Sequence, residues 1–177
     1  MNEIEIGARI NFDVIEKKLI SLGAVKQKDQ RQVDTICQLS HRELGRHEVV
    51  RLREKSGEVE ITYKEPILKK VDVVSRREIS FRTSAEEGKM FLEALGAKPL
   101  VVVDKVRRIY KLKDFNIGLD KVKDLGEFIE IELMGANKEI ARKRILSLME
   151  KLDINVNSLM GKPYFLMLLE KSEPKSI

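Results

Sequence analysis

Apolar and polar positions alternate strictly at the start of the chain, from Glu3 to Ile10. On a strand this places Ile4, Ile6, Ala8 and Ile10 on one face and Glu3, Glu5, Gly7 and Arg9 on the other. After Asn11, a residue that caps helices, the apolar positions are spaced as on one face of a helix until Gly23 provides a stop signal. The pattern predicts a strand over residues 3–10 and a helix over residues 12–22.

The rest of the chain repeats this change of periodicity. Capping residues precede two further helices, at Ser84 and at Asn137, and a last helix is expected from about Pro163. The connections between strands are too short for parallel crossovers, so the sheet should be largely antiparallel. Leu-Gly-Ala follows the first helix at residues 22–24 and the second at 95–97, which suggests two related strand–helix–strand halves. The other expected strands cover residues 31–39, 49–54, 58–64, 76–82, 100–112, 115–123 and 127–134.

Length and composition place the chain among folded globular proteins. Its 177 residues are 42% hydrophobic and 36% charged, which predicts one domain over residues 1–171 with a loose tail at 172–177. The single Cys37 excludes an internal disulfide. No signal peptide or membrane-spanning run is evident, so a cytoplasmic protein without membrane contact is expected. A net charge of +5 allows an anionic partner, although only three Tyr, six Phe and no Trp make nucleic acid an unfavoured one.

The polar faces of the predicted strands are dominated by Arg, Lys and Glu. Such alternation is usually explained by one solvated face of an antiparallel sheet. Here, however, Thr and Ser are scarce, and two strands carry a Glu-x-Glu pair, at residues 3–5 and 130–132. The charged positions therefore also fit a binding surface.

Carboxylates two residues apart on one strand face lie about 6 to 7 Å apart, a spacing that suits a hard divalent cation such as Mg²⁺ or Mn²⁺. Arg and Lys on neighbouring strands are suited to bind phosphate oxygens. If the sheet closes on itself, these charges line a tunnel, where they would be costly without a ligand. The combination predicts a metal ion together with a polyphosphate.

Motifs along nearly the whole chain resemble those of the CYTH superfamily, the triphosphate tunnel metalloenzymes. That family opens with Glu-x-Glu-x-Lys, whereas this chain has Gly7 at the position of the lysine. The block from Leu119 to Glu132 most resembles the class IV adenylyl cyclase branch, and residues 163–167 match the usual ending of that branch only loosely. The remaining matching motifs are Gln32-Val33-Asp34, Val50-Arg51-Leu52-Arg53, Thr62-Tyr63-Lys64, Arg76-Arg77-Glu78 and Lys105-Val106-Arg107.

The resemblance implies an α+β fold with a closed eight-stranded antiparallel β-barrel and helices outside it. It also implies which residues bind the metal: Glu3, Glu5, Glu78, Asp120, Glu130 and Glu132. The implied triphosphate-binding residues are Arg51, Arg53, Lys64, Arg76, Lys105 and Arg107. Glu3, Glu5 and Arg9 are the expected catalytic residues. Arg9 lies one step beyond Gly7 on the same strand face and could fill the space of the missing lysine, for which Lys162 is a weaker candidate.

The activity implied is conversion of ATP to cyclic AMP and pyrophosphate by a monomer or homodimer that uses Mg²⁺ or Mn²⁺. Hydrolysis of inorganic, nucleoside or thiamine triphosphate uses the same tunnel, and nothing in the charge pattern separates the two reactions. A non-catalytic module that binds polyphosphate or a nucleotide is a further alternative. All three readings expect a small-molecule triphosphate as the ligand.

Overall fold

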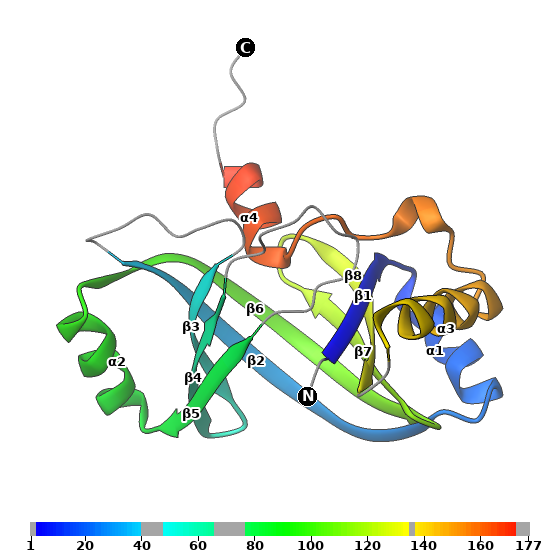
Figure 1. Cartoon of the computed structure of the whole chain (residues 1–177), viewed down its shortest axis with the longest axis horizontal. Helices are drawn as coiled ribbons and strands as arrows, with labels where there is room; N and C mark the ends of the chain where they lie inside the picture. Colours follow the sequence, from blue (N-terminus) through cyan, green and yellow to red (C-terminus); the bar gives the residue numbers. More distant parts are fainter. Residues whose placement is uncertain (1–2, 40–47, 66–76, 135–136, 173–177) are drawn as a thin grey trace, which may run out of the picture.

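A computed structural model describes residues 3–39, 48–65, 77–134 and 137–172 of the chain (Figure 1). The strands are β1 Glu3–Arg9, β2 Val25–Leu39, β3 Val49–Lys55, β4 Glu58–Lys64, β5 Glu78–Thr83, β6 Ala97–Leu112, β7 Phe115–Val122 and β8 Gly126–Met134. The helices are α1 Phe12–Ser21, α2 Ala85–Ala94, α3 Lys138–Lys151 and α4 Tyr164–Ser172, with a 3₁₀ turn η1 at Val156–Ser158. The predicted elements are all present where the structure describes the chain.

The eight strands form one antiparallel sheet in the order β1-β8-β7-β6-β2-β3-β4-β5. No hydrogen-bonded ladder joins β1 to β5 in the described residues, so the expectation of a closed barrel is not confirmed and the sheet is open at this seam. β1 and β5 have seven and six residues, whereas β2 and β6 have 15 and 16 and run across the molecule. Alternation along each strand predicts which face is buried, but it carries no information on whether the two outermost strands meet.

The strand order has the symmetry that the repeated Leu-Gly-Ala suggested. Each half of the chain runs strand, helix and then three antiparallel strands, and the first strand of each half pairs with the last strand of the other. Gly23 and Gly96 follow α1 and α2 with φ values of +86° and +70°, a conformation that favours glycine at the end of a helix.

Both long strands extend further than predicted, because the alternation is interrupted by bulges. β2 begins at Val25 rather than residue 31, and its pairing with β6 shifts between Lys26 and Lys28. A second shift between Ile36 and Cys37 brings Pro99 into the ladder. Bulges place an unpaired residue in one strand, which accommodates a proline and makes the sheet curve.

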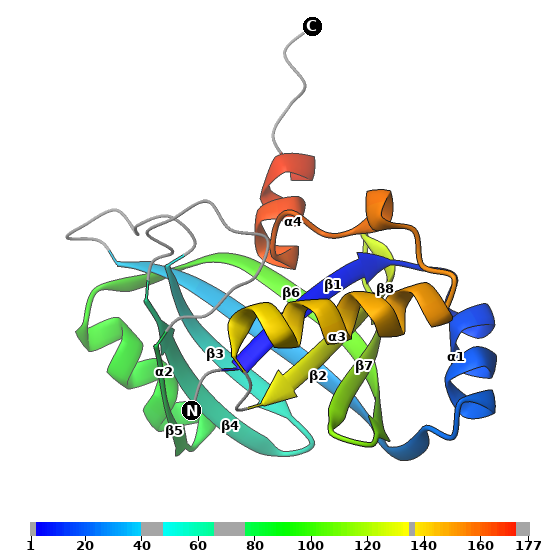
Figure 2. The same ribbon diagram turned by 45° about the vertical axis from the view of Figure 1, so that its right-hand side comes forward.

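Helices cover the outer face of the sheet. α1 and α3 pack on β1, β7 and β8, and α2 packs on β3 and β4 at the opposite end of the molecule (Figures 1 and 2). Ile4, Ile6 and Ala8 share one face of β1 as predicted, and this face is buried beneath α3. α4 packs at one end of the inner face, on an apolar cluster that includes Phe128 and Val103. The strand residues that alternate with these buried apolar residues, such as Glu5 of β1, therefore point to the inner face.

Candidate active site

The inner face of the sheet carries a cluster of charged side chains, here called the charged face. It is formed by Glu5, Asp34, Arg51, Arg53, Glu60, Lys64, Glu78, Lys105, Arg107, Asp120, Glu130 and Glu132, which come from all eight strands. Most of these side chains are buried or half-buried, and Asp120 is 0% exposed. Charges that lose water in this way are tolerated only when they are paired or bind a ligand.

Arg107 is the centre of one half of the charged face. Its Nε and Nη2 atoms donate to the two carboxylate oxygens of Asp120 at 2.7 and 2.6 Å, and Nη2 also donates to Glu130. Lys105 donates to Asp120 at 3.0 Å. A Cβ atom at Gly118 would lie 2.9 Å from the guanidinium of Arg107. Gly118 is therefore the small residue that lets this guanidinium lie against the sheet.

Arg53 and Arg51 are the central bases of the other half of the charged face. Arg53 donates to both carboxylate oxygens of Asp34 at 2.6 Å, a bidentate pair. Arg51 donates to Thr62 at 3.1 Å and lies 3.8 Å from Asp34 and from Glu60. Its Nε is buried without a hydrogen-bond partner in the described part of the chain. A donor in this state is available to an incoming anion.

Glu5 and Glu130 form a buried pair of carboxylates. The negative charge of Glu130, together with burial, raises the pKa of Glu5 to about 8. Burial opposes ionisation of Glu130 as well, but the charges of Arg107 and Lys105 prevail and lower its pKa to about 2. Glu132 lies directly opposite Glu5 in the ladder between β1 and β8. Acids that face one another in this way repel unless a proton or a cation lies between them.

The other predicted metal ligands have different partners. Asp120 is held by Arg107 and Lys105, and Glu78 by Lys64. The side chain of Glu3 and the whole of Arg76 lie outside the described residues. Within the described segments, no three His, Cys, Asp or Glu side chains converge on one point as a ready-made metal site. Glu5, Glu130 and Glu132 are the carboxylates that could hold a divalent cation, because their mutual repulsion is what such a cation would relieve.

Tyr164 was not predicted as a site residue. It begins α4, and its hydroxyl donates to Asp120 at 3.1 Å. Burial and the neighbouring charges of Glu130 and Asp120 raise its pKa, so that it keeps its proton and acts as a donor. The only signal in the sequence was the loose match of residues 163–167 to the ending of the cyclase branch.

The space beside Gly7 is filled by Met160 and not by Arg9. A Cβ atom at Gly7 would overlap the terminal methyl of Met160, whose backbone N–H donates to the carbonyl of Gly7 at 2.8 Å. Arg9 instead donates to the Leu125 carbonyl at 2.8 Å and lies 4.7 Å from the centre of the Phe128 ring. Lys162 pairs with Glu170. A cation at the position of the family lysine is thus replaced by a thioether.

Substitution of Gly7 by lysine should destabilise the protein by about 1 to 3 kcal/mol, because the new side chain must displace Met160. Removing that side chain in the double variant Gly7→Lys/Met160→Ala should restore part of this loss. Thermal or urea unfolding of the two single variants and the double variant measures the coupling energy. Strictly additive effects would contradict a steric conflict between residues 7 and 160.

Comparison with known proteins agrees with the geometry. The CYTH domain model matches residues 1–164, and the chain belongs to the CYTH domain family, whose members act on triphosphates. A candidate adenylate cyclase of Methanocaldococcus jannaschii is 28% identical over 172 residues, which are 93% of this chain and 97% of that protein.

Solved structures show the same fold. The PH1012 protein of Pyrococcus horikoshii is 31% identical, with a TM-score of 0.82 over 93% of this chain and 98% of that one. A candidate adenylyl cyclase of Hippeastrum, HpAC1, is only 13% identical but superposes with a TM-score of 0.73 over 99% and 98% of the two chains. No helix in the described segments is long and apolar enough to cross a membrane.

Proposed function

We propose that the protein is a metal-dependent enzyme that binds a triphosphate on the charged face and converts ATP to cyclic AMP and pyrophosphate. The observation that carries this proposal is the placement of the acids Glu5, Glu130 and Glu132 at one edge of a row of bases. The bases are Arg51, Arg53, Lys64, Lys105 and Arg107. A row of this kind offers phosphate oxygens several donors at once.

The balance of charge on this face argues for a cation that accompanies the phosphates. Glu5, Glu130 and Glu132 lie together at the β1 and β8 edge of the face, so the phosphates of a bare triphosphate would be repelled there. Mg²⁺ or Mn²⁺ held by Glu5, Glu130 and Glu132 would neutralise part of the charge on the phosphates. The residues present fit such an ion, because Glu5 and Glu130 repel one another and Glu132 lies opposite Glu5 in the ladder.

The protein's own side chains would position the phosphates. Arg51 has a free Nε donor, and the guanidiniums of Arg53 and Arg107 are oriented by their bidentate bonds to Asp34 and Asp120. Preoriented donors stabilise the charge that develops during phosphoryl or nucleotidyl transfer without having to reorganise. Tyr164 and the apolar cluster beneath α4 lie beside Asp120 at one end of the face.

Cyclisation of ATP and hydrolysis of a triphosphate are both compatible with this arrangement, and the comparisons contain a protein for each. The relative from Methanocaldococcus jannaschii carries the name of an adenylate cyclase, whereas the Hippeastrum protein is described as having a dominant triphosphatase activity. A cyclase requires the ribose 3′ hydroxyl in line with the α-phosphate. A triphosphatase requires a water molecule in line with the terminal phosphate.

Product analysis separates the two reactions. The purified protein is incubated with ATP or with inorganic triphosphate, in Mg²⁺, in Mn²⁺ or in EDTA, and the products are resolved by chromatography. Cyclic AMP with pyrophosphate is the expected result from ATP. Orthophosphate would assign the protein to the triphosphatases, and tight metal-dependent binding without any product would make it a binding module. Glu130→Gln, which weakens the acidic edge, should abolish whichever turnover is found.

A further inference from the structure

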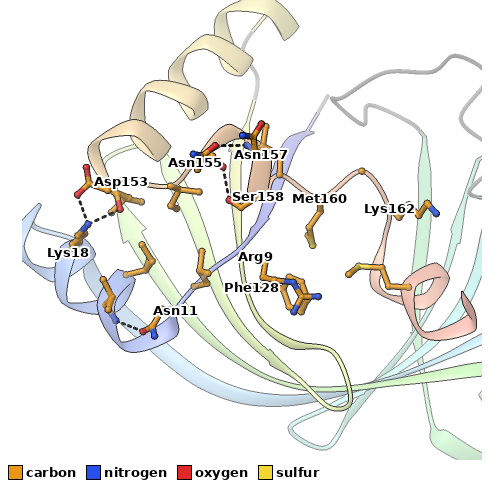
Figure 3. Close-up of a pocket in the computed structure, with 18 of the residues that line it drawn as sticks. Arg9, Asn11, Lys18, Phe128, Asp153, Asn155, Asn157, Ser158, Met160 and Lys162 are labelled. Carbon is orange, nitrogen blue, oxygen red and sulfur yellow. Dashed lines mark hydrogen bonds and ion pairs between the residues drawn. The ribbon is translucent and has the colours of Figure 1, made fainter. Parts of the chain in front are cut away.

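A cavity of about 750 Å³ lies beside the end of β1, at Arg9 (Figure 3). Its walls come from α1, from the segment that runs from Leu152 through η1 to Lys162, and from α4. In the view of Figure 3, Lys18 and Asp153 lie at one end of the cavity and Lys162 at the other, with Arg9, Phe128 and Met160 between them. None of these residues belongs to the charged face.

The chemistry of the cavity differs from that of the charged face. Apart from a few charged groups, its lining consists of apolar side chains such as Val14, Leu159 and Met167 and of asparagine side chains. Each cation in it already has a partner: Arg9 the Leu125 carbonyl, Lys18 the Asp153 carboxylate and Lys162 the Glu170 carboxylate. A polyphosphate would gain little here, whereas an uncharged ring with polar edges would find both apolar contact and hydrogen-bonding groups.

The charged face and the cavity both lie along β1, on either side of Gly7. Glu5, Gly7 and Arg9 share one side of this strand, so Arg9 lies about 13 Å beyond Glu5 at the usual rise per residue. Across the ladder, Gly7 lies opposite Glu130 and Arg9 opposite Phe128. Met160 fills the space at Gly7, so a ligand that extends from Glu5 towards Arg9 must displace its thioether, which is flexible.

The guanidinium of Arg9 provides a flat surface at the cavity. Its Cζ lies over the ring of Phe128, 4.7 Å from the ring centre, and Phe128 itself packs on Tyr164. The Arg9 side chain is exposed and lines the cavity. A guanidinium held by a ring and by a backbone carbonyl is well placed to stack a heterocycle that enters the cavity.

We infer that this cavity binds the nucleoside end of a nucleoside triphosphate, with the base stacked on Arg9 and the phosphates on the charged face. The inference rests on the proposed function, because it requires the phosphates to lie beside Glu5 and Glu130. It makes a nucleoside triphosphate, rather than inorganic triphosphate, the preferred ligand. Arg9 then contacts the base and does not replace the family lysine beside the phosphates.

Gly161→Trp tests this directly. Gly161 lines the cavity, and a Cβ atom there would meet no heavy atom within 4 Å, so a large side chain can enter the space without a clash at its base. Binding is measured by calorimetry with Mg²⁺ for two ligands that resist cleavage: bismethylene-ATP and its inorganic counterpart, bis(phosphonomethyl)phosphinate. The variant should weaken binding of the ATP analogue about tenfold or more, which is about 1.4 kcal/mol, and leave the inorganic analogue within about twofold.

Two further variants complete the design. Arg9→Leu removes the planar surface without filling the cavity and should weaken only the ATP analogue, which also covers the case in which Gly161→Trp does not fold. Met90→Trp, on the exposed surface of α2, is the matched control and should change neither affinity. Equal affinities of the wild type for the two analogues, or no effect of either cavity variant, would overturn the nucleoside site alone. Failure of the wild type to bind the inorganic analogue would overturn the proposed function and this inference with it.

Discussion

Replacing Arg107 by alanine should abolish turnover and lower the free energy of unfolding by about 3 to 5 kcal/mol. Arg107 is bonded to both Asp120 and Glu130, and the side chain of Asp120 is 0% exposed. Without the guanidinium, Lys105 alone would remain to compensate two buried carboxylates. For a domain of this size, the loss corresponds to a fall of roughly 6 to 20 °C in the melting temperature, which is measured by calorimetry beside the rate of triphosphate turnover.

Arg31→Ala provides a matched control on the outer surface. Arg31 also makes a bidentate pair, to Asp104 at 2.9 and 2.7 Å, but the pair is open to solvent. Water and salt screen such pairs, so the variant should keep the melting temperature and the turnover of the wild type. Equal losses in the two variants would show that the position of Arg107 on the charged face has no special role. Full activity of Arg107→Ala would remove this residue from the binding site.

Glu5→Gln should eliminate metal-dependent turnover and change how the stability of the metal-free protein depends on pH. The pKa of Glu5 is about 8 in the folded protein against 4.5 for the free side chain. The folded state therefore holds a proton that the unfolded state has lost, and stability falls as pH rises from about 4.5 through 8. Glutamine mimics the protonated carboxyl, so the variant should lack this slope and be more stable than the wild type above pH 8.

The pH dependence of metal binding tests the protonation of Glu5 independently of stability. A cation held by Glu5 must displace the proton, so the affinity for Mg²⁺ or Mn²⁺ should rise with pH up to about 8 in the wild type. Calorimetry in buffers of different ionisation enthalpy measures the protons released. Glu93→Gln, on the exposed surface of α2, should leave the pH profile and the metal affinity unchanged. A slope that persists in Glu5→Gln would assign the titration to another group.

Local patterns were sufficient for the elements and for the direction of the side chains. Alternation along residues 3–10 is confirmed by β1, whose apolar residues are buried against α3. The caps at Asn11, Ser84 and Asn137 each accept a hydrogen bond from the backbone of the helix that follows. These features depend on neighbours within a few residues, so they can be read from one stretch of chain at a time. The short sequence motifs that occur along the chain in the same order as in the CYTH superfamily identified the family.

Contacts between distant segments could not be read in this way. Nothing in the alternation of β1 and β5 indicates that they leave a seam rather than close a barrel. Met160 fills the space at Gly7 across more than 150 residues of chain, and Tyr164 reaches Asp120 from the last helix. The alternation of side chains along each strand was sufficient to predict that the carboxylates and the bases share one face of the sheet. Which acid is paired with which base depends on strand register and on the distances between side chains in the folded protein. The same distances raise the pKa of Glu5. The folded protein also decides that the cavity lies at Arg9.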